Sequence, residues 1–88
     1  MNWYKESYYN VTNLIARDIV TWLEQAYQGN VDFMSLDDDI SMRMSGIDDM
    51  NILSDAIVSA SNIVSEKQGG ELSPEQNQII TMLRQRIS

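Results

Sequence analysis

Apolar side chains recur every three or four residues over much of this chain, which is the spacing of amphipathic helices. The first such stretch covers about residues 8–28. Its stripe consists of Tyr8, Val11, Ile15, Ile19, Trp22 and Ala26, and Leu14, Leu23 and Tyr27 widen it. We expect this helix to begin between Asn2 and Asn10. It should end at Gly29 and Asn30, because both residue types tolerate the left-handed backbone that closes a helix.

Residues 31–45 are compatible with two structures. In a helix, Ser35 would be the N-cap and the aspartates at 37–39 would lie at the positive end of the helix dipole. The apolar stripe of that helix would be Leu36, Ile40 and Met44. In a hairpin, Val31 and Phe33 would lie on one strand and Ile40, Met42 and Met44 on the other. The helix is favoured, because Met and Asp are poor strand formers and no Asn-Gly or Asp-Gly turn is present.

A third stretch begins with a helix-start signal. Asp48 is the predicted N-cap, and Ile47 and Ile52 have the spacing of a hydrophobic staple around it. The core-facing positions that follow are Leu53, Ala56, Ile57, Ala60, Ile63 and Val64. Small residues, among them Ala56 and Ala60, would let a neighbouring helix approach closely, so we expect this helix at the centre of a bundle. It should stop before Gly69.

The last stretch has the clearest start. Ser73 is placed as an N-cap, Pro74 follows at the first helical position, and Gln76 completes a capping box. Its apolar stripe is Ile79, Ile80, Leu83 and Ile87, so we expect a helix that runs to the C-terminus. The pattern as a whole predicts an all-α fold, a small three- to four-helix bundle with a short acidic second helix. The alternative is an α+β fold with a hairpin at residues 31–45.

The chain has 88 residues, of which 43 % are hydrophobic, and this length suits a single helical domain over residues 1–88. It contains neither His nor Cys. The usual general base, the usual nucleophiles and the soft ligands of zinc or iron are therefore missing, and we expect no enzyme, no cofactor and no metal site. The run Asp37, Asp38 and Asp39 lacks the alternating ligands and central Gly of a calcium loop. The absence of Cys, of a signal peptide and of a long apolar run predicts a cytoplasmic protein.

Negative charge is concentrated in the middle of the chain. Residues 32–55 hold seven aspartates against one arginine, a net charge of −6 out of −7 for the whole protein. Binding to DNA, RNA or anionic lipid depends on basic residues, so we expect neither direct nucleic-acid binding nor membrane binding. A helix-turn-helix reading around Gly46 fails for the same reason, because its recognition helix would begin with Asp48 and Asp49.

These features favour a non-enzymatic protein–protein interaction module. We expect a small acidic inhibitor or adaptor that binds a basic surface of a partner protein. Such proteins are common among phage and mobile-element products, in which case the compartment is the host cytoplasm. The candidate partner-binding residues are Asp37, Asp38, Asp39, Asp48, Asp49, Met42, Met44, Trp3, Tyr4, Tyr8 and Tyr9. The alternative is a structural or assembly subunit, a homo-oligomer or a part of a larger complex, that packs through its aromatic-rich N-terminal helix.

Overall fold

The structure is a computed structural model that describes the backbone of residues 3–87 and the side chains of residues 8–87. It contains four helices, Trp3–Tyr27 (α1), Phe33–Met44 (α2), Met50–Lys67 (α3) and Pro74–Arg84 (α4), and no strand within residues 3–87. The predicted all-α bundle is confirmed. The hairpin alternative for residues 31–45 is wrong, because α2 occupies most of that segment.

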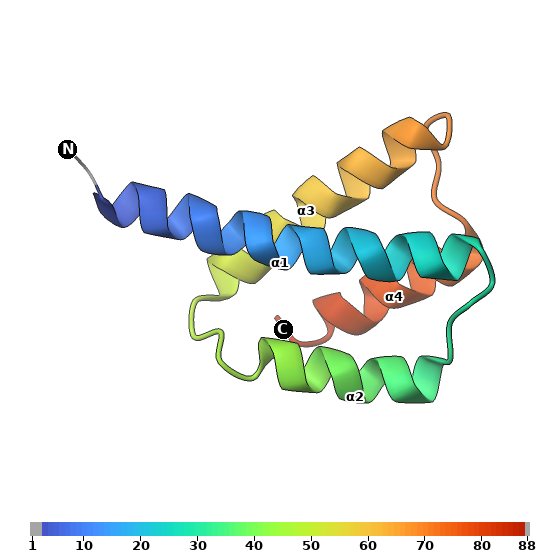
Figure 1. Cartoon of the computed structure of the whole chain (residues 1–88), viewed down its shortest axis with the longest axis horizontal. Helices are drawn as coiled ribbons and strands as arrows, with labels where there is room; N and C mark the ends of the chain where they lie inside the picture. The colour runs from blue at the N-terminus through green and yellow to red at the C-terminus, as the bar shows by residue number, and fades with distance from the viewer. Residues whose placement is uncertain (1–2, 88) are drawn as a thin grey trace.

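The longest helix, α1, packs against both α3 and α4, and α3 packs against α4 as well (Figure 1). The largest fully buried side chains come from all four helices and include Ile19, Leu23, Ile40, Leu53, Ile57, Ile79 and Leu83. Ala56 and Ala60 are fully buried on α3, as their small size predicts. α3 makes its most extensive contact with α1, and α1 also contacts α4 more extensively than α3 does. The central helix is therefore α1, and the prediction that α3 is central is wrong.

Glycine stops α1 where the sequence predicts. Gly29 adopts a positive φ of 77°, and its N–H donates to the carbonyl of Ala26 at 3.1 Å. The N–H of Asn30 reaches the carbonyl of Gln25 at 2.9 Å. This pair of bonds is a Schellman motif, which satisfies carbonyls that the helix end would otherwise leave without partners.

The buried stripe of α1 is narrower than the apolar pattern predicts. Leu14, Val11 and Tyr27 are 58 %, 41 % and 61 % exposed, so their assignment to the core is wrong, and Ile63 of α3 is also exposed. Thr12 and Ala16 are buried instead. The hydroxyl of Thr12 donates to the carbonyl of Tyr8 at 2.8 Å, and this hydrogen bond makes its burial tolerable.

The N-cap of α2 lies three residues before the predicted one. Asp32 caps the helix, because its carboxylate accepts hydrogen bonds from the N–H of Met34 and from the hydroxyl of Ser35, each at 3.1 Å. Ser35 therefore lies inside the helix. The aspartates at 37–39 follow it in the middle turns, so the prediction that they lie at the positive end of the dipole is wrong. The buried stripe Leu36, Ile40 and Met44 is confirmed.

The N-cap of α3 is Asp49, one residue later than predicted, and its carboxylate accepts from the N–H of Asn51 at 2.9 Å. Ile47 and Ile52 both pack against the core, but Ile52 is then not at the staple position. The capping box of α4 is confirmed, because the Ser73 hydroxyl accepts from the Gln76 N–H at 3.2 Å and the Gln76 side chain accepts from the Ser73 N–H at 2.8 Å. α4 ends at Arg84, short of the C-terminus.

Candidate functional site

α2 has one face in the core and one face in solvent. Met34 and Met42 are 82 % and 76 % exposed, the two highest values among the large hydrophobic side chains described. Asp38 lies midway between them and is exposed as well. Spacings of four residues place these three side chains on one side of a helix. We call Met34, Asp38 and Met42, together with the adjacent and exposed Asp39, the α2 outer face.

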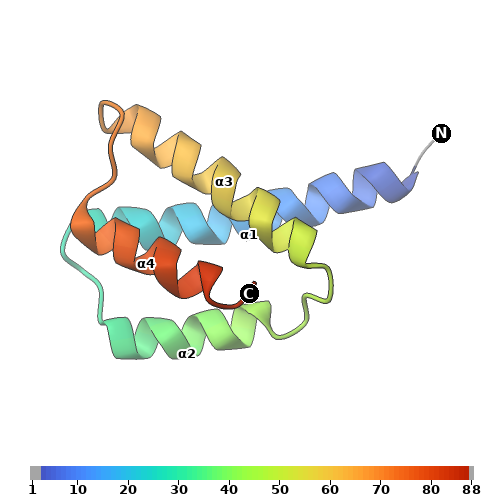
Figure 2. The ribbon, with the colours of Figure 1, turned by 180° about the vertical axis from the view of Figure 1, so that it is seen from behind.

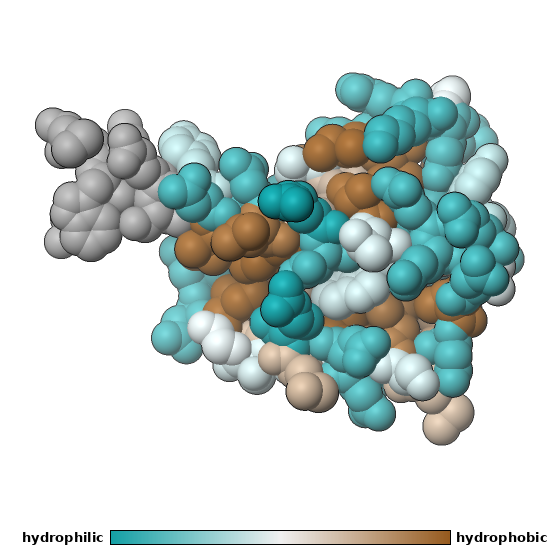
Figure 3. All heavy atoms as spheres, in the orientation of Figure 1, coloured by the Kyte–Doolittle hydropathy of each residue, from teal (hydrophilic) through white to brown (hydrophobic). Residues whose placement is uncertain are grey.

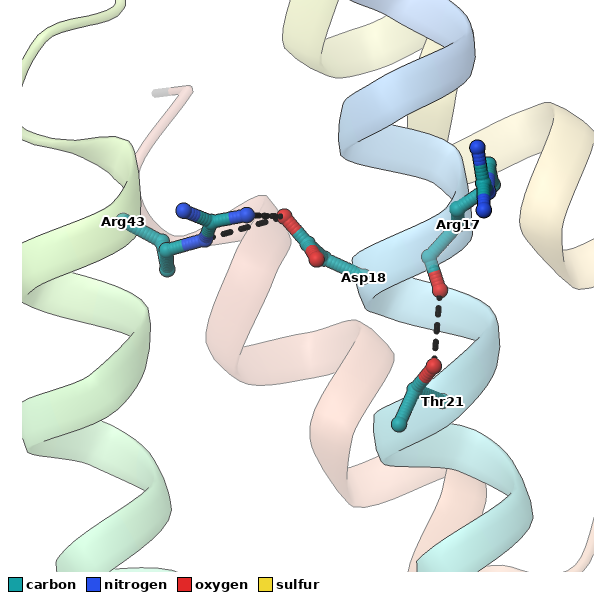
Figure 4. Close-up of polar contacts among 4 residues, drawn as sticks. All are labelled: Arg17, Asp18, Thr21 and Arg43. Carbon is teal, nitrogen blue, oxygen red and sulfur yellow. Dashed lines mark hydrogen bonds and ion pairs between the residues drawn. The ribbon is translucent and has the colours of Figure 1, made fainter.

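Two arginines join α2 to the rest of the protein. Arg43 donates from Nη2 and Nε to Asp18 of α1, at 2.7 and 3.0 Å (Figure 4). Arg86, beyond the end of α4, donates to Asp37 at 3.3 Å and to the hydroxyl of Ser41 at 2.7 Å. Both arginines thus link α2 to other parts of the described chain through their side chains. Because both ion pairs are substantially exposed, each is worth at most about 1 kcal/mol.

The predicted acidic residues therefore have different surroundings. Asp37 is paired with Arg86, and Asp49 is the cap of α3. Asp38, Asp39 and Asp48 are exposed, and none of them has a recorded hydrogen bond or ion pair within the part of the chain that the structure describes. No described cationic group lies within 4 Å of any of these three carboxylates, so each can accept from a partner.

The methionines of α2 are also divided between core and surface. Met42 is exposed, as its predicted role requires, but Met44 is only 7 % exposed and packs in the core. Met44 is therefore not a surface contact, and that prediction is wrong. Met34 was not among the predicted contact residues, although it is the most exposed large hydrophobic side chain described. Once Asp32 is taken as the N-cap, the eight-residue spacing between Met34 and Met42 identifies it.

The N-terminal aromatic residues are only partly described. The predictions for Trp3 and Tyr4 lie outside the residues whose side chains the structure describes. The hydroxyl of Tyr8 donates a short hydrogen bond to Asp55 of α3, and this bond, with the neighbouring negative charge, raises the pKa of Tyr8 to about 12. Tyr9 packs edge to face against Tyr8, with ring centroids 5.8 Å apart, and is 60 % exposed. Tyr8 is thus engaged within the protein, whereas most of Tyr9 is open.

The N-terminal part of α1 extends past the other helices in both ribbon views (Figures 1 and 2). Apolar side chains gather on the surface over the first half of this helix, and others reach the surface over α3 (Figure 3). Exposed Val11 and Leu14 belong to the first half of α1, and exposed Val58 and Ile63 belong to α3. This end of α1 is a second candidate contact surface.

The comparisons and the metal geometry offer no further assignment. Within the described residues, no group of three or more acidic, His or Cys side chains is arranged to hold a metal ion. No helix in this part of the chain has the length and apolar character needed to cross a membrane. No family model, no curated protein and no solved structure matches the chain.

Proposed function

We propose that this protein is a non-enzymatic protein-binding module whose α2 outer face docks on a basic surface of a partner protein, as an inhibitor or adaptor does. The observation that carries the proposal is the combination on one helix face of carboxylates without partners, Asp38 and Asp39, with the exposed methionines Met34 and Met42. The opposite face of the same helix is buried, so the outer face is held in a fixed orientation.

The acidic residues would act mainly on the rate of encounter. Opposite charges attract over about 8 Å at physiological salt, which raises association rates more than it slows dissociation. Asp48 lies in the loop between α2 and α3 and adds to the same negative region of sequence. Repulsion of phosphates by this region is the reason that we propose a protein partner and no direct contact with nucleic acid or membrane.

The methionines would supply the apolar part of the contact. A thioether side chain is flexible and polarizable, so it adapts to partner surfaces of different shape. Each methionine that becomes buried contributes about 1.5–3 kcal/mol before the cost of ordering its side chain. Met34 and Met42 are eight residues apart, which is about 12 Å along the axis at 1.5 Å per residue. They would therefore enter two neighbouring pockets on a partner.

The small size, the acidity and the absence of Cys fit a cytoplasmic protein, and fit the small inhibitors and adaptors of phages and mobile elements.

Comparative capture from cells of the source organism tests the proposal. The bait would be the wild-type protein, an Asp38→Lys and Asp39→Lys double variant, and a control in which Glu66 and Glu71, two exposed acids elsewhere, are changed to Lys. We expect a protein that the wild type and the control both retain and that the double variant loses. Equal retention by all three baits would rule out the α2 outer face.

A second candidate function is assembly through the N-terminal half of α1. The exposure of Tyr9, Val11 and Leu14 on a helix end that extends beyond the bundle favours it. A Leu14→Glu substitution would place a charge in such an interface and should abolish oligomers while the helical circular dichroism signal is retained. If the wild type is monomeric at every concentration, this second candidate is wrong.

A further inference from the structure

A groove of about 650 Å³ lies between α1 and α3. Its lining consists of Asn13, Ala16, Arg17, Val20 and Thr21 from α1 and of Ser59 and Ile63 from α3. Ala16 is buried, Val20 is half-buried and Ile63 is 42 % exposed, so the groove has an apolar component in reach of solvent. Exposed apolar surface inside a concave region favours occupation by another apolar group.

The only charged side chain in the lining is Arg17. Its side chain points away from the neighbouring Asp18, which pairs with Arg43 of α2 (Figure 4), and its guanidinium makes no hydrogen bond or ion pair among the described residues. In a protein of net charge −7, this groove therefore presents an uncompensated positive charge. A complementary occupant carries a carboxylate together with apolar side chains.

The α2 outer face has this composition. Asp38 lies four residues from Met34 and four from Met42, so the carboxylate is central and the two methionines are about 6 Å from it along the axis in either direction. A helix laid in this groove can bring Asp38 opposite Arg17, with its methionines toward a lining whose apolar members are Ala16, Val20 and Ile63.

We infer that the groove between α1 and α3 receives the α2 outer face of a second copy of this protein. α3 and α2 lie on opposite sides of α1 in both ribbon views, so a molecule that offers its groove to one neighbour still offers its α2 outer face to another (Figures 1 and 2). The contact is heterologous, and such contacts repeat head to tail unless a rotation closes them into a ring.

The association is weak. Two copies with a charge of −7 each repel one another, and salt screens this repulsion beyond about 8 Å while the close contact between Arg17 and Asp38 is screened less. The inference does not rest on the proposed partner binding. A partner bound to the α2 outer face would compete with the second copy, so the two contacts would exclude one another.

Sedimentation velocity of the full chain at physiological salt tests the inference. The sedimentation coefficient of the wild type should rise from micromolar to millimolar concentration without levelling off at the value of a dimer. Arg17→Glu and Asp38→Lys should each weaken the association constant about tenfold or more, because each places like charges opposite one another. A chain that carries both substitutions should associate again, because a carboxylate at position 17 of one copy then faces an ammonium group at position 38 of the next.

Matched controls place the same charge changes elsewhere. Arg84→Glu and Glu66→Lys alter exposed residues outside both surfaces and should leave the association unchanged within about twofold. A wild type that sediments independently of concentration would overturn the inference, as would a closed dimer or single variants that associate like the wild type. Arg17→Glu should still capture any partner that the α2 outer face binds, so a failure here is distinct from a failure of the proposed function.

Discussion

Replacing Gln76 by Ala should destabilise this protein more than replacing any other polar residue of α4. Gln76 is fully buried, and its side chain meets three segments. Its Oε1 accepts from the Ser73 N–H and from Gln68 Nε2, both at 2.8 Å. Its Nε2 donates to the carbonyl of Leu23 at 2.9 Å and to Gln68 Oε1 at 2.6 Å. One amide therefore connects the end of α1, the C-cap of α3 and the N-cap of α4.

The magnitude follows from the groups that lose a partner. The Ser73 N–H would lose its acceptor, and an unsatisfied group of this kind costs about 1–3 kcal/mol. The Leu23 carbonyl, which lies inside α1, would lose one of its donors, and Gln68 is half-buried and can turn toward water. With the cavity left by the shortened side chain, we expect a loss of about 2–4 kcal/mol. For a domain of this size that corresponds to a fall in Tm of about 8–32 °C.

Urea unfolding followed by circular dichroism measures this free energy. Gln78→Ala is the matched control, because Gln78 lies on the exposed side of the same helix and should change stability by less than about 0.5 kcal/mol. If Gln76→Ala costs no more than the control, the buried amide does not connect the three segments in solution and the reasoning is refuted.

Three further predictions concern single contacts. The hydrogen bond from Tyr8 to Asp55 raises the pKa of Tyr8 to about 12, so its contribution to stability should be complete below pH 10 and be lost as the pH rises through about 12. Tyrosinate absorbance should show one late-titrating tyrosine that Tyr8→Phe removes, and a late titration that survives this substitution would contradict the assignment. A double-mutant cycle between Asp18 and Arg43 should give a coupling of at most about 1 kcal/mol that decreases with salt, and a larger, salt-independent value would contradict an exposed ion pair. Ser73→Ala should lower the free energy of unfolding by about 0.5–2 kcal/mol in urea titrations, and a neutral result would mean that the capping box is not formed.

The parts of the fold that depend on neighbouring residues could be predicted from the sequence. The start of α4 is fixed by Ser73 and Gln76, whose side chains accept from one another's backbone N–H within a single turn, and by Pro74 at the first helical position. The buried stripe of α2 follows from a spacing of four residues alone. Gly29 ends α1 because the left-handed conformation at this position is a local requirement.

The predictions from sequence fail where two residues compete to cap the same helix. They also fail where segments far apart in the chain decide which side chains are buried. Asp32 and Ser35 are both competent caps, and Ser35 donates to Asp32 instead of capping the helix itself. Leu14 was assigned to the core because periodicity gives the direction of an apolar stripe. The width of the buried part of that stripe depends on how many helices surround α1, and Leu14 lies outside it. The bond between Gln76 and Leu23 joins residues far apart in the chain, so the sequence shows the capping role of Gln76 and not its burial.

The candidate site was predicted in part for the same reasons. Charge density identifies the segment that holds Asp38 and Asp39, because counting charges needs no structure. Which aspartates are free is a tertiary property, since Arg86 reaches Asp37 from the far end of the chain. Met44 and Met42 have the same chemistry, and only the orientation of α2 decides which of them is buried.

The most direct test of the central claim is the association rate between this protein and a captured partner, measured at low and at physiological salt. We predict that Asp38→Lys with Asp39→Lys slows association about tenfold or more at low salt and reduces its salt dependence, while the Glu66→Lys and Glu71→Lys control binds nearly as the wild type does. Met34→Ala with Met42→Ala should instead speed dissociation. Association rates that are the same for the wild type and both charge-reversed variants would contradict docking through the α2 outer face.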